Sequence, residues 1–230
     1  MFGFGKKSPP KLVVPEGKTF FDTLNHTFDD VPVGAAPDHK IPTEKFLAAS
    51  EDYVTMFTNH FQDVNNGVVF GRVLDDMTAN IQKIRTAYLA NPIEGEFLQD
   101  LVLKEQTMGL TGEDEKANTG LFWLVRALEF SVQAVINAMN EPDKTLSNNF
   151  QTAYAATLGK WHDAKASFAY GLLLKGVPYR KDFIPLLGAD EAKLKSQALP
   201  YASSMQKVLD TLDPFVVNKI AAHIGKSKNK

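Results

Sequence analysis

The sequence contains no cysteine, so it can form neither disulfide bridges nor thiolate metal sites. It has no basic surplus either, because 25 Lys and Arg residues stand against 27 Asp and Glu residues. A nucleic-acid partner is therefore not expected, since phosphate binding usually shows as a basic stripe. No segment approaches the roughly 18 uninterrupted apolar residues of a membrane span, and the start of the chain does not read as a secretory signal. We expect a soluble protein in the cytoplasm.

Signatures of catalysis are also missing. None of the five histidines has a glutamate three residues before it, which removes the Glu-x-x-His pair of di-iron helical bundles. There is no His-Glu-x-x-His motif, no glycine-rich phosphate loop and no Gly-x-Ser-x-Gly elbow. We expect no metal ion, no cofactor and no enzymatic activity. One catalytic alternative stays open, in which Asp76 and His162 act as an acid-base pair.

Helical periodicity is what the sequence does contain. With 230 residues, 44% of them hydrophobic, the chain can bury a sizeable core. Strand alternation and hairpin dipeptides are absent, so the predicted fold class is all-α, with about eight helices. Apolar spacing and boundary residues predict helices at 20–28, 43–61, 68–90, 94–108, 118–139, 147–175, 190–212 and from 213 onward, with a short turn over 182–188.

Two boundary predictions are specific. Ser147 is expected to cap a helix that continues to Gly176, and Asp213 with Pro214 to open the last helix. For domain organisation we expect a flexible N-terminal extension at 1–18, a single domain at 19–225 and a basic tail at 226–230.

A polar stripe borders the apolar face of the predicted helix at 68–90. Asp76, Asn80 and Lys83 are four and three residues apart, which places them within an arc of roughly 60° on a helix. The flank beside them is apolar, with Val73, Met77, Ile81, Ile84 and Tyr88. A carboxylate, an amide and an ammonium group at the margin of a core form a good set for binding hydroxyl groups. A salt-bridged structural edge is the alternative reading.

Three separated motifs in this order resemble the glycolipid transfer protein family. Asp76, Asn80 and Lys83 match its Asp, Asn and Lys motif, and Trp123 in LFWLVRALEF matches its tryptophan helix. His162 stands sixteen residues before Pro178, as the family's histidine stands before its Pro-Tyr pair. The similarity runs from about Phe20 to Phe215. The sequence looks most similar to the fungal members linked to heterokaryon incompatibility in three segments, FFDTLNHTFDDVPVG, GLFWLVRALEF and VPYRKDF.

The resemblance implies a two-layer helical sandwich that carries one glycosphingolipid between membranes. Trp123 would stack on the first sugar, Asp76, Asn80 and Lys83 would bind its hydroxyls, and His162 would bind the ceramide amide. The hydrocarbon chains would occupy an apolar pocket between the helix layers. Arg126, one turn after Trp123, is expected to orient an acidic neighbour such as Asp76.

The alternatives to a glycolipid carrier are a glycolipid sensor that acts through a protein partner, a ceramide-phosphate carrier, and an enzyme acting on a sphingolipid. The family's ceramide-phosphate branch has basic residues where its glycolipid branch has the stacking Trp, so Trp123 favours a sugar head group.

Two further features concern partners. Animal and fungal members have a membrane-docking aromatic residue two positions after the histidine, whereas here Ala164 fills that position and Trp161 precedes His162. Trp161 is therefore a candidate for membrane contact, and inward packing is the alternative. The tetrad FFDT at Phe20–Thr23 resembles the core of the motif by which lipid-transfer proteins bind a receptor of the endoplasmic reticulum, although it has no acidic lead-in.

Overall fold

The computed structural model describes residues 14–61, 68–110, 114–221 and 223. Within these ranges the chain forms eight α-helices and no β-strand, so the all-α prediction is confirmed. The α-helices are α1 (Thr43–Phe61), α2 (Val68–Ala90), α3 (Leu98–Thr107), α4 (Lys116–Asn140), α5 (Leu146–Ala156), α6 (Ala164–Lys175), α7 (Arg180–Leu187) and α8 (Glu191–Phe215). Short 3₁₀ turns lie at Phe20–Thr23, Phe28–Asp30 and Leu158–Lys160, and a π-helical turn follows at Val216–Ala221.

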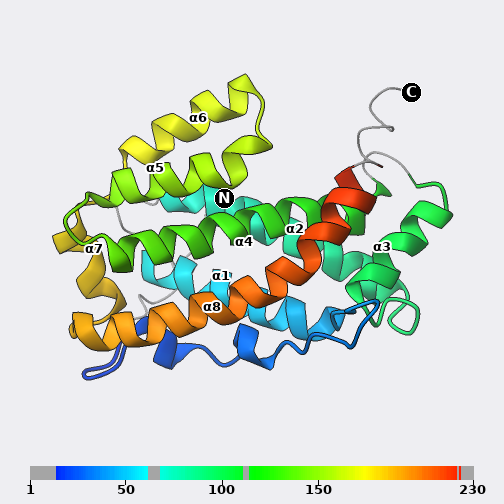
Figure 1. Ribbon diagram of the computed structural model, residues 1–230, viewed down its shortest axis with the longest axis horizontal. Coiled ribbons are helices and arrows are strands. Elements are labelled where there is room, and N and C mark those ends of the chain that lie inside the picture. The colour runs from blue at the N-terminus through cyan, green and yellow to red at the C-terminus, as the bar shows by residue number, and fades with distance from the viewer. Residues whose placement is uncertain (1–13, 62–67, 111–113, 222, 224–230) are drawn as a thin grey trace, which may run out of the picture.

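Helix α4 is the centre of the molecule and packs against α2, α5 and α8 (Figure 1). Helix α1 lies against α2, while α6 contacts α5 and α2. Helix α4 has the length and apolar character of a membrane-spanning helix, but most of that segment is buried inside the fold. A helix at the centre of a helical sandwich is apolar around most of its circumference because its neighbours bury it on most sides.

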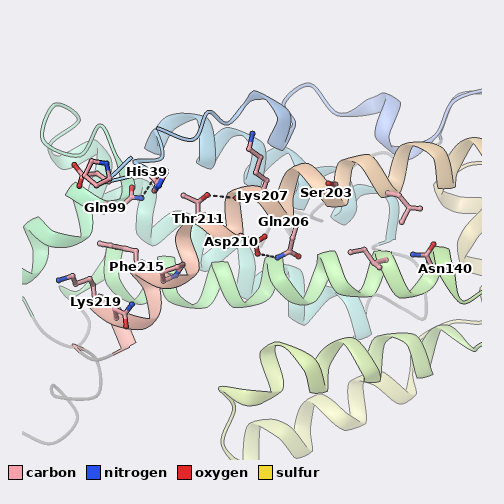
Figure 2. A pocket seen from close by; sticks show the side chains of 16 residues that line it. His39, Gln99, Asn140, Ser203, Gln206, Lys207, Asp210, Thr211, Phe215 and Lys219 are labelled. Atoms are coloured by element: carbon pink, nitrogen blue, oxygen red, sulfur yellow. Dashed lines mark hydrogen bonds between the residues drawn. The ribbon is translucent and has the colours of Figure 1, made fainter. Parts of the chain in front are cut away.

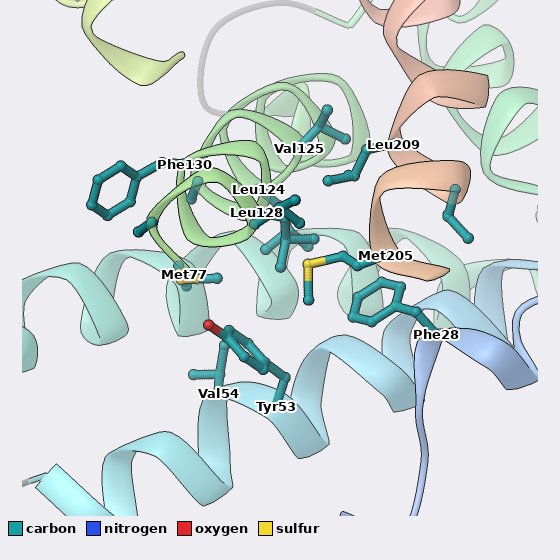
Figure 3. Packing of buried hydrophobic residues seen from close by; sticks show 14 of the residues in the cluster. Phe28, Tyr53, Val54, Met77, Leu124, Val125, Leu128, Phe130, Met205 and Leu209 are labelled. Carbon is teal, nitrogen blue, oxygen red and sulfur yellow. The ribbon is translucent and has the colours of Figure 1, made fainter. Parts of the chain in front are cut away.

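The core forms where α4 meets α1, α2 and α8. Leu124 and Leu128 of α4 approach Met205 of α8 and Tyr53 of α1, as Figure 3 shows. Met77 of α2 joins the same cluster and is buried. The predicted apolar flank of α2 therefore faces the interior.

Close contact between α2 and α4 depends on Gly120. A methyl group built on Gly120 would lie 2.8 Å from the carbonyl oxygen of Asn80 and 3.0 Å from Cβ of Lys83. Only a residue without a side chain lets α4 approach the polar stripe of α2 this closely. Asn91 and Pro92 follow the end of α2 at Ala90, as expected from the restrictions that proline imposes.

Several sequence-based helix predictions are wrong, among them the short turn expected over 182–188, which is the helix α7. The segment 147–175 is not one helix, because α5 ends at Ala156 and the side chain of Asp163 caps a new helix by accepting a hydrogen bond from the backbone N–H of Ala166 at 2.8 Å. Thr145, not Ser147, caps α5. The expected helix at 20–28 is two 3₁₀ turns instead.

Asp213 and Pro214 do not open the last helix. They lie inside the end of α8, which continues to Phe215 and then becomes the π-helical turn. The Asp213 carboxylate is occupied by Arg126 of α4 at 2.6 Å, so it cannot act as a helix cap.

Most of the expected extension at 1–18 and all of the basic tail at 226–230 lie outside the described residues. The described end of the extension forms a turn in which the N–H of Lys18 bonds the carbonyl of Pro15 at 3.0 Å. Lys193 of α8 donates to the Gly17 carbonyl at 2.8 Å, so this turn is attached to the helical domain.

Candidate functional site

The polar stripe on α2 has the graded exposure of a binding edge. Asp76 is exposed, Lys83 is half-buried, and Asn80 is only 3% exposed. Lys83 donates a hydrogen bond from Nζ to Oδ1 of Asn80 at 3.2 Å, so these two side chains are already oriented toward each other. The one-face arrangement predicted from helical spacing is confirmed.

Trp123 lies on α4, the helix that approaches this stripe at Gly120. It is one helical turn after Gly120, the residue whose backbone contacts Asn80 and Lys83. Its indole ring is half-buried and packs edge-on against Phe122 with 5.0 Å between ring centroids. On its other side the ring of His162 has its centroid 5.7 Å away.

His162 is on the turn between the 3₁₀ segment at Leu158–Lys160 and α6, not on a helix as expected. The Tyr154 hydroxyl lies 2.9 Å from Nδ1 of His162 and holds the imidazole against α5. This turn passes close to Tyr154 because Gly159 has no side chain: a methyl group there would lie 2.8 Å from the Tyr154 carbonyl oxygen. The turn thus brings His162 next to Trp123.

Burial lowers the pKa of His162 below its usual value of 6.5, and the negative charges of Asp76 and Asp163 offset part of this effect. The imidazole is therefore neutral at pH 7, with one nitrogen a donor and the other an acceptor. No hydrogen bond joins Asp76 to His162 among the described residues, so the geometry does not favour the acid-base pair.

Arg126 pairs with acidic neighbours as expected, but Asp76, the example named for this role, is not among them. Arg126 is buried and pairs with Glu129 at 2.7 Å and with Asp213 of α8 at 2.6 Å. Its guanidinium lies 4.7 Å from the ring centroid of Trp161, within cation–π range. Arg126 thus joins α4, α8 and the turn that carries His162.

Trp161 packs toward the protein interior. Its ring meets Phe122 edge-on at 5.3 Å and covers Arg126 on another side. It is half-buried, and a role in membrane contact stays a prediction.

An apolar cavity of about 80 Å³ lies between the helices. Met77, next to Asp76 on α2, lines it, and so does Phe130, whose ring meets Tyr170 of α6 at 5.7 Å. Helices α1, α2, α4, α5 and α7 enclose it. The lining residues are Tyr53, Val73, Leu74, Met77, Phe130, Ser131, Ala134, Val135, Ala138, Met139, Phe150, Phe183, Ile184 and Leu187.

A larger groove of about 1010 Å³ follows α8 and reaches the end of α4 at Asn140 (Figure 2). Most of its lining residues are polar, with His39, Lys207 and Asp210 among them. It contains none of the five predicted ligand-binding residues, so it is separate from the site around His162.

The FFDT tetrad is part of the folded core. Phe20 is 1% exposed, and Phe21 packs against Tyr201 of α8 with 5.1 Å between ring centroids. Receptor binding through Phe20–Thr23 stays a prediction, and it would require this segment to leave the core.

Two site residues escaped the sequence analysis. Tyr154 holds His162, and Tyr170 packs against both, with ring centroids 4.4 Å from Tyr154 and 5.7 Å from His162. Tyr154 lies eight residues before His162 and Tyr170 eight residues after it, and this spacing was a usable signal only once the break at Asp163 was known.

Comparison with known proteins identifies relatives over most of the chain. The sequence profile of the glycolipid transfer protein (GLTP) family matches residues 41–189. The chain is 39% identical to a glycolipid transfer protein of Aureobasidium melanogenum, over 90% of this chain and 97% of that protein. It is 28% identical to human pleckstrin homology domain-containing family A member 8, over 95% of this chain but only 41% of that longer protein.

The crystal structure of HET-C2, described as a fungal glycolipid transfer protein, superposes with a TM-score of 0.76 at 34% sequence identity. The match covers 88% of this chain and 99% of that one. The predicted fold and the predicted likeness to fungal proteins are thereby confirmed.

Proposed function

The chain belongs to the glycolipid transfer protein family, and we propose that it carries glycosphingolipids between membranes without making or breaking a covalent bond. The observation that carries this proposal is the combination of three features: the polar stripe of α2, the Trp123 and His162 rings, and an apolar cavity that is lined by Met77, the neighbour of Asp76 on α2. A lipid with a sugar, an amide and two alkyl chains has the matching order of chemical groups.

The sugar would bind between α2 and α4. An indole face stacks on the CH-rich face of a sugar ring, and Trp123 has its ring beside the stripe. The Asp76 carboxylate is exposed and accepts charge-assisted hydrogen bonds, while Asn80 and Lys83 supply an amide and an ammonium donor. A planar ring next to such groups favours a sugar over a phosphate, which fixed cations bind better.

The ceramide amide would bind His162. When the Tyr154 hydroxyl donates to Nδ1, the neutral imidazole keeps its proton on Nε2. That N–H is then free to donate to the carbonyl oxygen of the amide and to set the depth of the lipid.

The alkyl chains would enter the apolar cavity. Each methylene group that stays out of water saves about 0.8 kcal/mol, so a carrier must enclose the chains to move them. An engineered cavity of about 150 Å³ holds only one benzene molecule, so chains must push the lining residues of this cavity apart as they enter.

We propose that the protein resides in the cytoplasm and makes transient contact with membrane surfaces. Helix α6 supports the membrane contact, because it exposes Phe168 and Leu172, one helical turn apart, at 70% and 52%. An exposed apolar pair beside the lipid site is suited to insertion into a bilayer surface.

Membrane contact through α6 is tested with a variant carrying Phe168→Ser and Leu172→Ser. Its affinity for vesicles should fall at least about tenfold, because two apolar side chains lose their burial. A matched variant with Leu89→Ser and Ile93→Ser, exposed apolar residues at the end of α2, should bind as the unaltered protein does. Equal losses in both variants would refute contact through α6.

For Trp161, a blue shift of its fluorescence emission on adding vesicles, measured in a Trp123→Phe background, would support membrane contact, and no shift would oppose it.

The sugar site is tested with Trp123→Ala. Transfer of glucosylceramide or galactosylceramide between vesicles should be abolished, since the stacking surface is lost. Tyr179→Ala, which removes an exposed aromatic ring before α7, is the control and should transfer normally. Unchanged transfer by Trp123→Ala would overturn the assignment.

A further inference from the structure

Tyr170 has a buried hydroxyl group that the protein leaves unpaired. The residue is 8% exposed, and its hydroxyl oxygen has no hydrogen-bond partner among the described residues. Most buried polar side-chain atoms in folded proteins do have a partner, because an unpaired one loses the hydrogen bonds it made to water. The Tyr170 hydroxyl is therefore a group that gains from a ligand able to pair with it.

The position of Tyr170 shows which part of a ligand it would meet. Its ring stacks on Tyr154 at 4.4 Å, with only 10° between the two ring planes. One side of it faces His162 and another faces Phe130, each with 5.7 Å between ring centroids. Since Phe130 lines the apolar cavity, Tyr170 lies at the junction between the proposed amide site and the chain pocket.

Burial and the neighbouring groups keep the Tyr170 hydroxyl protonated, so it can donate a hydrogen bond. Its pKa is raised chiefly by burial, with further increases from Tyr154 and from the carboxylate of Asp76. The hydroxyl therefore keeps its proton at neutral pH.

We propose that the Tyr170 hydroxyl binds a hydroxyl group that the ceramide carries within two carbons of its amide linkage, and that the site favours lipids hydroxylated there. This inference rests on the proposed function. With the amide at His162, the carbons on either side of the amide reach the depth of Tyr170, and the alkyl chains beyond them carry no polar group. The hydroxyl has two sources: the 3-hydroxyl of the sphingoid base and a 2-hydroxyl on the acyl chain.

The test compares three glucosylceramides: one with a plain acyl chain, one with a 2-hydroxyacyl chain, and one that lacks the sphingoid 3-hydroxyl. Binding and vesicle-to-vesicle transfer are measured for the unaltered protein and for Tyr170→Phe, which keeps the ring and removes the hydroxyl. The unaltered protein should bind the lipid with the partner hydroxyl about fivefold to tenfold better than the lipid without it, the size of one buried hydrogen bond. Tyr170→Phe should bind the two equally.

Tyr201→Phe is the matched control. Tyr201 of α8 is also buried with an unpaired hydroxyl, but it packs on Tyr53 and Phe28 and does not contact His162. This variant should keep the preference of the unaltered protein. Because each substitution removes an unpaired buried group, both variants should melt no lower than the unaltered protein.

The results separate the two proposals. A preference that survives in Tyr170→Phe, or no preference for either hydroxyl in the unaltered protein, would overturn the role of Tyr170 while glycolipid transfer stands. If the unaltered protein carries none of the three glucosylceramides, the proposed function fails and this inference with it. The source of the hydroxyl follows from which lipid loses its advantage in Tyr170→Phe.

Discussion

His162 is held by aromatic neighbours from three helices and belongs to none of them. The rings of Trp123, Tyr154 and Tyr170 each have a centroid 5.7 Å from the imidazole. Such packing fixes the ring plane, and the contact with Tyr154 fixes which nitrogen is free. Burial among these rings also disfavours the imidazolium, so the orientation and the protonation state of His162 have the same cause.

The lowered pKa of His162 predicts how stability changes with pH. The unfolded chain takes up a proton at the usual pKa of 6.5, before the folded protein does, so this group's contribution to stability is present above pH 6.5 and is lost as the pH falls below it. In His162→Gln the free energy of unfolding should fall less between about pH 7.5 and pH 5. Urea unfolding at several pH values measures this. Parallel curves for the two proteins would contradict the effect of burial.

At the scale of helices, the site depends on how closely α4 approaches α2. Gly120 sets that distance, and Arg126, two turns further along α4, ties the helix to Asp213 of α8 and to the ring of Trp161. The same helix therefore carries the proposed sugar-stacking ring, faces the stripe and supports the turn of His162. A shift of α4 would disturb all three together.

Gly120→Ala should shift that helix. The added methyl group would meet the Asn80 carbonyl at 2.8 Å, and overpacking of this kind costs about 1–3 kcal/mol. We expect a lower melting temperature and slower glycolipid transfer. Gly171→Ala in α6 is the matched control, because a methyl group there meets nothing within 4 Å and alanine favours a helix. A Gly120→Ala protein as stable as the control would show that the two helices are not in close contact.

Local patterns predicted some elements and failed for others. The bounds of α2 and its polar stripe followed from helical spacing and from Pro92, which are both local signals. The break before α6 was missed because only Gly159 and Asp163 mark it, and the contact that selects it is with Tyr154. Helical spacing alone explains the stripe equally well as a hydroxyl-binding site and as a salt-bridged structural edge.

Long-range contacts were out of reach of the sequence. Arg126 could not be matched with Asp213 because the two are 87 positions apart and Asp213 reads locally as a helix cap. The unpaired hydroxyl of Tyr170 likewise appears only when α5, α6 and α4 are packed together. The grouping of Asp76, Asn80, Lys83, Trp123 and His162 as a site came from the family resemblance, and their roles in binding stay predictions.

For the whole molecule, the order of environments from surface to core matches the order of groups in a glycosphingolipid. Exposed Asp76 comes first, then the half-buried Trp123 and His162, then buried Tyr170, whose ring contacts Phe130 in the lining of the apolar cavity. Such a gradient binds a head group by hydrogen bonds while it removes alkyl chains from water. The pair Phe168 and Leu172 is exposed on α6, and contact of this pair with the membrane is part of the proposal.

The most direct test of this account is a vesicle-to-vesicle transfer assay of the unaltered protein with glucosylceramide, ceramide phosphate and phosphatidylcholine in parallel. The site around Trp123 predicts transfer of glucosylceramide, with the other two lipids at the rate seen without protein. Transfer of ceramide phosphate in preference to glucosylceramide, or failure to move glucosylceramide at all, would contradict it.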